Sequence, residues 1–358
     1  VLIARGRQRA LQPLMETMMA FCCRQMTEQN RGGNDFSVRE LVTAIQELER
    51  AGVTATETTQ AWRDHLARIV PEKCYQCIAV SADAPIGNWA AFNAVGELAR
   101  AAAGIVDSAS VGAYVERQIG SQMLSFVPEG MYRDPHNPMV YDSVTRGLMA
   151  AALHFGYDGV YRAQIENLLV NAAPILLRMQ SVSGEMPFGG RSNQCMHNEA
   201  HLALQFEWYA AFFARRGEPS LAAQCKDAAL LALESIEHWL DAAPGRHIKN
   251  RFPSGSAFGC EGYAYFDKYM ITLASFVYLA EMFADDTIAP EPCPARTGGY
   301  VLRTPEAFHK IFANVGGYFV EFDTAADFHY DGSGLGRVHK AGAPEPLCLS
   351  VPFPGPHA

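Results

Sequence analysis

The sequence predicts a mainly α-helical protein in which helical hairpins form an α/α toroid, followed by a C-terminal antiparallel β segment. Three observations support this fold class. Apolar residues recur with the 3.6-residue period of amphipathic helices from the N-terminus to about residue 286. Short turn-forming breaks divide that stretch, as successive hairpins require. After about residue 290 the pattern changes to short alternating runs separated by glycine pairs and Asp-Gly turns.

The helical part divides into segments of about 12–20 residues. Glycines stand where several segments should end, and Ser37 precedes Glu40 with the spacing of a capping box. Polar and aromatic residues recur at helix starts, which favours a toroid over an irregular stack because a toroid gathers such starts at one mouth. The expected helices cover residues 7–29, 37–51, 56–69, 88–104, 109–126, 143–155, 159–180, 196–215, 219–240 and 263–284.

The change of pattern predicts two domains. Residues 1–290 are expected to form the toroid, and residues 291–358 a β-rich segment with alternating runs such as Gly317–Asp323. This segment is short for an independent sandwich. It is therefore either a small antiparallel sheet packed on the toroid or a truncated β-sandwich.

Composition narrows the class of protein. The chain has 358 residues, 49% of them hydrophobic, and a mean hydropathy near zero, which describes a globular protein with a sizeable core. Its net charge of −9 disfavours general nucleic-acid binding, which needs a basic face. No apolar run is long enough to predict a membrane span. The first residues lack the order of a signal peptide, so they do not indicate a localisation.

The sequence contains 9 cysteines, an odd number, so a free thiol is expected. Cys74 and Cys77 have the spacing of a redox or zinc half-site, but no second pair of this kind follows. We therefore expect no metal or redox centre at this pair.

Two segments, Met186–His201 and Phe258–Met270, carry polar side chains that helix packing does not require. Together these side chains could bind an anion and move a proton, as the cleavage of an acidic sugar polymer requires. They are Arg191, Asn193, Gln194, His197, Asn198, His201, Tyr263, Tyr265, Lys268 and Tyr269.

An acidic sugar polymer can be cleaved without water when a base removes the C5 proton and the 4-oxygen leaves. This proton is poorly acidic while the neighbouring carboxylate is charged, so hydrogen bonds or a cation must neutralise the carboxylate. Amide, imidazole and guanidinium groups suit that task. A tyrosine or histidine suits the role of base, and one tyrosine can also return a proton to the leaving oxygen.

The loop from Gly184 to Gln194 should lead into a helix that Ser192 or Asn193 caps. Backbone donors at that helix start, with Arg191 beside them, would bind a carboxylate. The alternative is that these groups only cap the helix and satisfy one another.

His197 and His201 lie one helical turn apart, with Asn198 adjacent. Such a pair can bind zinc, but no glutamate directly follows the first histidine, and a third ligand would have to come from far along the chain. No metal or cofactor is therefore predicted. In the second segment Tyr265 and Tyr269 share a helix face, where they could also be an aromatic packing stripe.

A tyrosine has a pKa of ~10 and acts as a base near neutrality only beside positive charge. Lys268 and Arg191 are the candidates for that charge.

The order of these motifs resembles the toroid-plus-sheet polysaccharide lyases, which include the heparinase-II/III-like, oligoalginate, alginate and glucuronan lyases. The resemblance covers roughly residues 85–345. It rests on the Asn/His cluster, the later Glu-Gly-x-x-Tyr-x-x-x-Tyr run from Glu261 to Tyr269, and a β-rich segment with His309, His329 and His339. It implies a carbon–oxygen lyase acting on an acidic polysaccharide, in the periplasm or secreted.

The resemblance also implies roles for individual residues. Tyr265 would transfer the proton, with Tyr263 or Tyr269 as the alternatives. Asn198 with His197, or Asn193 with His201, would hold the carboxylate. In this sequence the histidine precedes the asparagine, which is the reverse of the order in the oligoalginate enzymes.

Other residues could line the substrate subsites. Trp89, beside Asn88, could stack on a sugar ring or belong to the core, and Tyr141 begins another helix. His329, Arg337 and His339 stand among turn glycines and are expected at the rim of a cleft.

Two other functions stay open from the sequence. The first is a glycoside hydrolase on the same toroid, which needs two carboxylates flanking the bond. Its candidate acids are Asp142, Glu185, Glu199, Glu261 and Asp267. The second is a non-catalytic carbohydrate-binding protein.

Overall fold

The computed structural model describes residues 1–28, 33–192, 194–242, 247–249, 268–327, 330 and 332–349, the side chains of Glu28 and Lys268 excepted. The chain forms two compact units. The first comprises Val1–Ser125 and Leu148–Glu166, and the second comprises Phe126–Gly147 and Asn167–Ala358.

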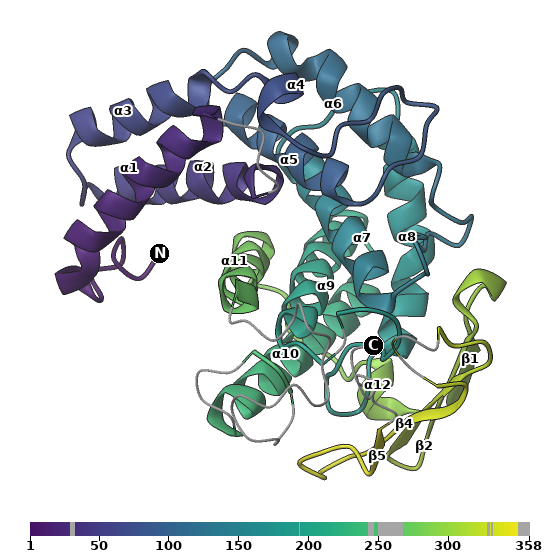
Figure 1. Cartoon of the computed structure of the whole chain (residues 1–358). Coiled ribbons are helices and arrows are strands. Elements are labelled where there is room, and N and C mark those ends of the chain that lie inside the picture. Colours follow the sequence, from purple (N-terminus) through teal and green to yellow (C-terminus); the bar gives the residue numbers. More distant parts are fainter. Residues whose placement is uncertain are drawn as a thin grey trace, which may run out of the picture. The chain divides into compact units, whose positions relative to one another are not determined.

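The first unit is helical (Figure 1). Two helices, α7 (Met139–His154) and α8 (Arg162–Met179), contribute residues to both units. The helices that belong wholly to the first unit are η1 (Arg9–Leu11), α1 (Gln12–Glu28), α2 (Asn34–Ala51), α3 (Thr56–Ala67), α4 (Pro71–Cys74), α5 (Trp89–Ala102) and α6 (Ser108–Met123).

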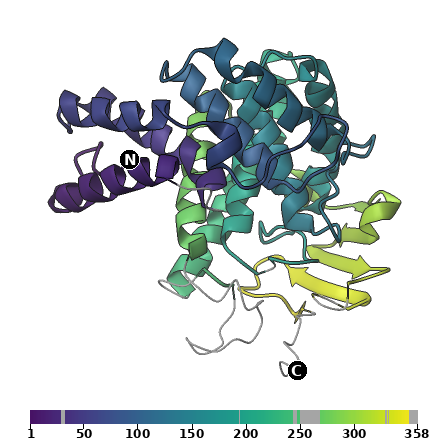
Figure 2. The same cartoon turned by 45° about the horizontal axis from the view of Figure 1, so that its top comes forward.

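Small residues let the helices of the first unit pack closely. Ala90, Ala91 and Ala94 of α5 are fully buried, and a Cβ atom at Gly96 would come within 3.1 Å of the Val38 Cβ on α2. Helix α2 therefore packs directly against α5, while α1 lies beside α3 (Figure 2). The burial of these apolar faces supplies the core of the unit.

The start of α2 corrects one sequence prediction. Ser37 was placed by its spacing at the N-cap, but the helix begins at Asn34 and the Ser37 hydroxyl donates to the Gly33 carbonyl at 2.7 Å, one turn back. Asp35 accepts hydrogen bonds from the backbone N–H groups of Gln76 and Cys77, both at 3.0 Å. Cys74 thus ends α4, and Cys77 lies in the following loop, which Asp35 anchors.

The second unit combines long helices with a sheet (Figure 1). Helix α9 (His197–Arg215) packs against both α10 (Pro219–Ala242) and α11 (Lys268–Phe283). Fifteen of its residues are buried, so it forms the centre of this unit. A short helix α12 (Pro294–Thr297) precedes the sheet.

The C-terminal sheet has five antiparallel strands in the order β1-β2-β3-β4-β5. Phe312 and Phe319 are fully buried on one face of it, and Phe308, just before β2, is fully buried as well. A register shift between Glu321 and Phe322 interrupts the pairing of β3 with β4. The strands are β1 (Tyr300–Arg303), β2 (Lys310–Val315), β3 (Tyr318–Asp323), β4 (Gly334–Lys340) and β5 (Cys348–Leu349), with a 3-10 turn η3 (Glu306–Phe308) before β2.

The mainly helical class and the C-terminal antiparallel sheet are confirmed. The expected helices appear as α1–α3 and α5–α11 with ends shifted by a few residues, and residues 263–267 lie outside the described part of the chain. The change of pattern near residue 290 falls inside the second unit. Closure of the helices into a toroid stays a prediction. None of the described helices is long and apolar enough to span a membrane.

Candidate active site

The loop before α9 folds back on itself and points Glu185 inward. Ser181 N–H donates to the Glu185 carbonyl at 3.0 Å, and Gly184 N–H donates to the Ser181 carbonyl at 2.9 Å. Gly184 has a φ of +80°, and a Cβ atom there would lie 2.1 Å from the Leu231 carbonyl of α10. Glycine is therefore required, and the turn is held directly against α10.

The first turn of α9 follows two strained residues. Ser192 and Gln194 adopt φ values of +63° and +60°, which side-chain-bearing residues rarely do. The N-cap position, Met196, makes no side-chain capping bond. Asn198 Nδ2 donates to the Ser192 carbonyl at 3.0 Å and so ties the helix to the loop. Its Oδ1 atom has no hydrogen-bond partner among the described residues.

A short backbone pairing holds residues 247–249 beside the start of α9. It consists of an isolated antiparallel bridge between Cys195 and Ile248 and of two hydrogen bonds, Met196 N–H to the His247 carbonyl at 2.7 Å and Lys249 N–H to the Gln194 carbonyl at 2.6 Å. This pairing brings the side chain of Lys249 to the loop and to the first turn of the helix.

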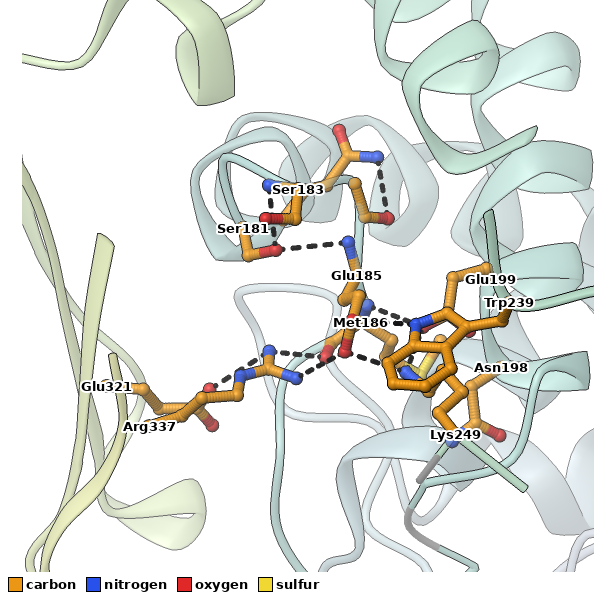
Figure 3. Close-up of polar contacts among 12 residues, drawn as sticks. Ser181, Ser183, Glu185, Met186, Asn198, Glu199, Trp239, Lys249, Glu321 and Arg337 are labelled. Atoms are coloured by element: carbon orange, nitrogen blue, oxygen red, sulfur yellow. Dashed lines mark hydrogen bonds and ion pairs between the residues drawn. The ribbon is translucent and has the colours of Figure 1, made fainter. Parts of the chain in front are cut away.

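Lys249 lies at the centre of a buried ionic cluster (Figure 3). Its Nζ atom is 2.9 Å from Glu185 Oε2 and 2.8 Å from Glu199 Oε1. Glu185 Oε2 also accepts from Arg337 NH1 at 3.2 Å, and Glu185 Oε1 accepts from Trp239 Nε1 at 3.1 Å. The cluster therefore joins the loop, α9, α10 and β4 within the second unit.

Arg337 connects the sheet to this cluster (Figure 3). It donates to the Met186 carbonyl at 2.6 Å and lies 3.3 Å from Glu321 Oε2 on the neighbouring strand β3. His339, two residues further along β4, is fully buried, and neither of its ring nitrogens has a hydrogen-bond partner among the described residues.

The charges of the cluster move the pKa values of its glutamates in opposite directions. Burial raises the pKa of Glu185, but the charges of Lys249, His339 and Arg337 outweigh it and hold the pKa well below its ordinary value. The pKa of Glu199 is raised, chiefly by burial, because only the Lys249 ammonium opposes this effect strongly. Burial lowers the pKa of Lys249, yet the two carboxylates raise it above its ordinary value, so the ammonium stays charged.

His197 lies in an aromatic and basic environment at the start of α9. Its ring stacks on the ring of Tyr269 with centroids 4.5 Å apart and an interplanar angle of 11°. The ring of His201 lies 5.7 Å from it, and that of His247 lies 5.8 Å from Tyr269. Burial, followed by the charges of His247 and Lys249, lowers the pKa of His197 from 6.5 to about 3. The imidazole is therefore neutral near pH 7.

The structure thus brings the rings of His197 and Tyr269 together, with His201 one turn further along α9. Asn198 follows His197 in the helix and bonds the Ser192 carbonyl. Arg191, which the sequence places beside the carboxylate, instead forms an ion pair with the buried Asp134, and its guanidinium lies 4.6 Å from the Tyr141 ring centroid.

Tyr141 and Gln194 belong to the loop structure around this pair. The Tyr141 hydroxyl is 2.8 Å from Ser192 Oγ, and the buried Gln194 supplies the carbonyl that Lys249 N–H bonds.

Asn88 and Trp89 belong to the first unit. Asn88 is buried, whereas Trp89 keeps 39% of its surface exposed while its ring lies 4.8 Å from that of Phe36, edge to face. The tryptophan is therefore half packed and half accessible.

Several predicted residues lie outside the described part of the chain, and their roles stay predictions. They are Asn193, Tyr263, Tyr265 and His329, together with the candidate acids Glu261 and Asp267; for Lys268 only the backbone is described.

For four residues in or near the cluster, the sequence-based expectation was wrong or lacking. Arg337 and His339 are expected on turns at a cleft rim, but both lie buried in β4. His309 pairs with Asp323, with Nδ1 and Oδ1 2.5 Å apart. Lys249 carries no recognisable motif, and only the chain pairing between residues 194–196 and 247–249 reveals its place.

In the part of the chain that the structure describes, no group of three or more His, Cys, Asp or Glu side chains could hold a metal ion. Neither a scan against protein-family models nor a search of curated proteins gives a match.

Proposed function

We propose that this protein is a polysaccharide lyase that cleaves a uronic-acid-containing glycan, alginate- or glucuronan-like, by β-elimination on an α/α toroid. The observation that carries the proposal is the grouping of the neutral His197, Asn198 and the Tyr269 phenol at the N-terminal end of α9. This grouping offers the hydrogen-bonding groups and the proton carrier that the reaction needs.

Neutralisation of the substrate carboxylate comes first. The Asn198 Nδ2 group gives one hydrogen to the Ser192 carbonyl and has a second N–H that can donate to a substrate carboxylate. The neutral His197 ring can donate one N–H, and its Nδ1 is without a described partner. The N-terminal end of α9 adds the positive end of the helix dipole.

The phenol then moves the proton. As a phenolate it takes the C5 proton, the C4–O4 bond breaks as the C4–C5 double bond forms, and the phenol returns the proton to the departing O4. Tyr269 is the described tyrosine in contact with His197. Tyr265 lies outside the described residues and stays the first candidate for this step, as the sequence predicts.

The three candidate acids that the structure describes, Asp142, Glu185 and Glu199, do not form the open pair that a glycoside hydrolase needs. The Lys249 ammonium fills the space between Glu185 and Glu199, bonded to both. Asp142 is fully buried and accepts from Arg146 Nε at 3.0 Å. A glycosidic bond therefore has no room between Glu185 and Glu199.

The decisive experiment offers the full chain alginate, glucuronan, heparin-type and pectic polymers. A lyase produces an unsaturated uronate, which absorbs in the near ultraviolet, without incorporating oxygen from labelled water. New reducing ends without that absorbance indicate the hydrolase instead. Saturable binding without turnover on any polymer indicates a carbohydrate-binding protein.

A further inference from the structure

The start of α9 needs support from outside the helix. Its N-cap residue makes no side-chain bond, and the loop before it contains two side-chain-bearing residues, Ser192 and Gln194, in the left-handed region. Such a backbone persists only where surrounding contacts fix it. His197 and Asn198, at the start of the helix, would otherwise be free to shift.

Lys249 makes contacts of the required kind. Its backbone N–H bonds the Gln194 carbonyl at 2.6 Å, and its ammonium bonds Glu199 in the first turn of α9 at 2.8 Å. The same ammonium bonds Glu185 of the preceding loop at 2.9 Å. One side chain thus fastens the helix start to the loop on one side and to its own segment on the other.

The two carboxylates depend on Lys249 to different degrees. Glu185 also receives hydrogen bonds from Arg337 at 3.2 Å and from Trp239 at 3.1 Å. Glu199 also accepts the Met186 backbone N–H at 2.9 Å, and Lys249 is its cation at hydrogen-bonding distance among the described residues. Loss of the ammonium therefore acts mainly on Glu199, two residues along the helix from His197.

We propose that Lys249 is the positioning residue of this site, whose buried ammonium fixes the first turn of α9 and thereby sets the place of His197 and Asn198. The inference rests on the proposed function, because it concerns the same site. Lys249 itself does not touch the substrate in this proposal.

The charge of Lys249 supports the same conclusion. The groups that face His197 are His201 on its own helix, Tyr269 on α11, and His247 and Lys249 on the paired segment. After burial, the charges of His247 and Lys249 lower the pKa of His197. A neutral variant at position 249 should therefore raise that pKa, whereas an arginine should keep it low.

The test compares Lys249→Met and Lys249→Arg with a matched control. Lys226 is a second buried lysine, on α10, and its ammonium bonds Glu207 at 2.9 Å. Glu207 lies on α9, eight residues beyond Glu199. Lys226→Met therefore removes an equivalent ion pair from α9 without touching its first turn. Activity is followed as kcat and KM for unsaturated product, and the His197 pKa by NMR of 15N-labelled imidazoles in the full chain.

Lys249→Met is expected to lower kcat about 100-fold with a much smaller change in KM, because the site is misplaced rather than lost. Lys249→Arg should recover most of that loss. Lys226→Met should leave kcat within about threefold of the wild type. The His197 pKa should rise in Lys249→Met alone.

Equal losses of kcat in Lys249→Met and Lys226→Met, or an unchanged His197 pKa in Lys249→Met, would overturn the proposal. If Lys249→Met does not fold, the double variant Lys249→Met/Glu199→Gln replaces it, because this variant leaves no unpaired carboxylate at position 199. A wild-type kcat in the double variant would then overturn the proposal. Absence of lyase activity in the wild type contradicts the proposed function, and the NMR measurement then decides the role of Lys249 alone.

Discussion

At His339 a titratable side chain is buried without any described hydrogen-bond partner. Burial, followed by the charge of Arg337, lowers its pKa from 6.5 to about 3. Between these values the unfolded chain binds a proton that the folded chain does not, so the free energy of unfolding falls as the pH decreases from 6.5 toward 3.

We expect His339→Leu to weaken this pH dependence. As the pH falls from 6 to 4, the free energy of unfolding should decrease by about 1 kcal/mol less per pH unit in the variant than in the wild type. The reason is that the variant has no imidazole at position 339 to take up a proton on unfolding. Urea unfolding at a series of pH values measures the difference. Parallel stability curves for the two proteins would show that His339 titrates equally in both states.

The proton carrier can be assigned by single hydroxyl deletions. Tyr265→Phe is expected to lower lyase turnover at least ~100-fold with unchanged circular dichroism, because the phenol carries the C5 proton. Tyr269→Phe should keep the ring that stacks on His197, and it should lower turnover less than Tyr265→Phe does. The reverse ranking would transfer the role to Tyr269, and full activity of both variants would remove tyrosine from the mechanism.

At the scale of elements, Arg337 is the described link by which β4 reaches the loop carrying Glu185 and Met186. Arg337→Met leaves the buried Glu321 without its nearest cation, and we expect a loss of about 3–5 kcal/mol in the free energy of unfolding.

The control for Arg337→Met is Lys340→Met on the same strand. Lys340 is exposed, and its Nζ atom lies 5.5 Å from the centroid of the Tyr318 ring. Lys340→Met should therefore lower the free energy of unfolding by about 0.5 kcal/mol or less. Adding Glu321→Gln to Arg337→Met should restore part of the loss, since no carboxylate is then left unpaired. Denaturant unfolding of the four proteins measures these differences, and similar losses for Arg337→Met and Lys340→Met would mean that the buried pair contributes little.

The helices could be predicted from the sequence because a 3.6-residue apolar period reports directly on one buried face. Strand β4 was harder to predict. Its glycines suggest turns, yet Gly336 sits inside the strand, where a Cβ atom would approach the Glu321 carbonyl to 3.4 Å beside the irregular pairing of β3 with β4. The glycine marks a close backbone approach, so Arg337 and His339 become interior residues rather than rim residues.

At the scale of the molecule, the sequence identified one half of the candidate site better than the other. His197 and Asn198 could be found because they are polar residues in one short segment, and Tyr269 because it follows a distinctive aromatic run. Lys249 could not be found, and Arg337 was expected at a cleft rim rather than in the interior, since their places depend on backbone pairings between distant segments. Local patterns carry no information about such pairings.

The net charge of −9 has a consequence for an acidic polymer as substrate. Protein and polymer repel each other at long range, and salt screens that repulsion. We expect KM for the polymer to fall roughly twofold as the ionic strength rises from about 0.01 to 0.15 M, the opposite of the behaviour of a basic polyanion-binding protein. Steady-state kinetics over that range tests this, with a neutral oligosaccharide product analogue as inhibitor control. A rising KM would indicate an exposed basic approach surface.

The turn at Gly184 limits how the chain can diverge in evolution. Any side chain there would collide with the Leu231 carbonyl, whereas at Gly217, which shares the left-handed backbone, nothing lies within 4 Å of a Cβ atom. Substitutions at 217 cost only local backbone strain, while those at 184 also displace α10 from the loop that carries Glu185. A side chain should therefore be tolerated better at 217 than at 184, where the bend beneath the ionic cluster admits only glycine.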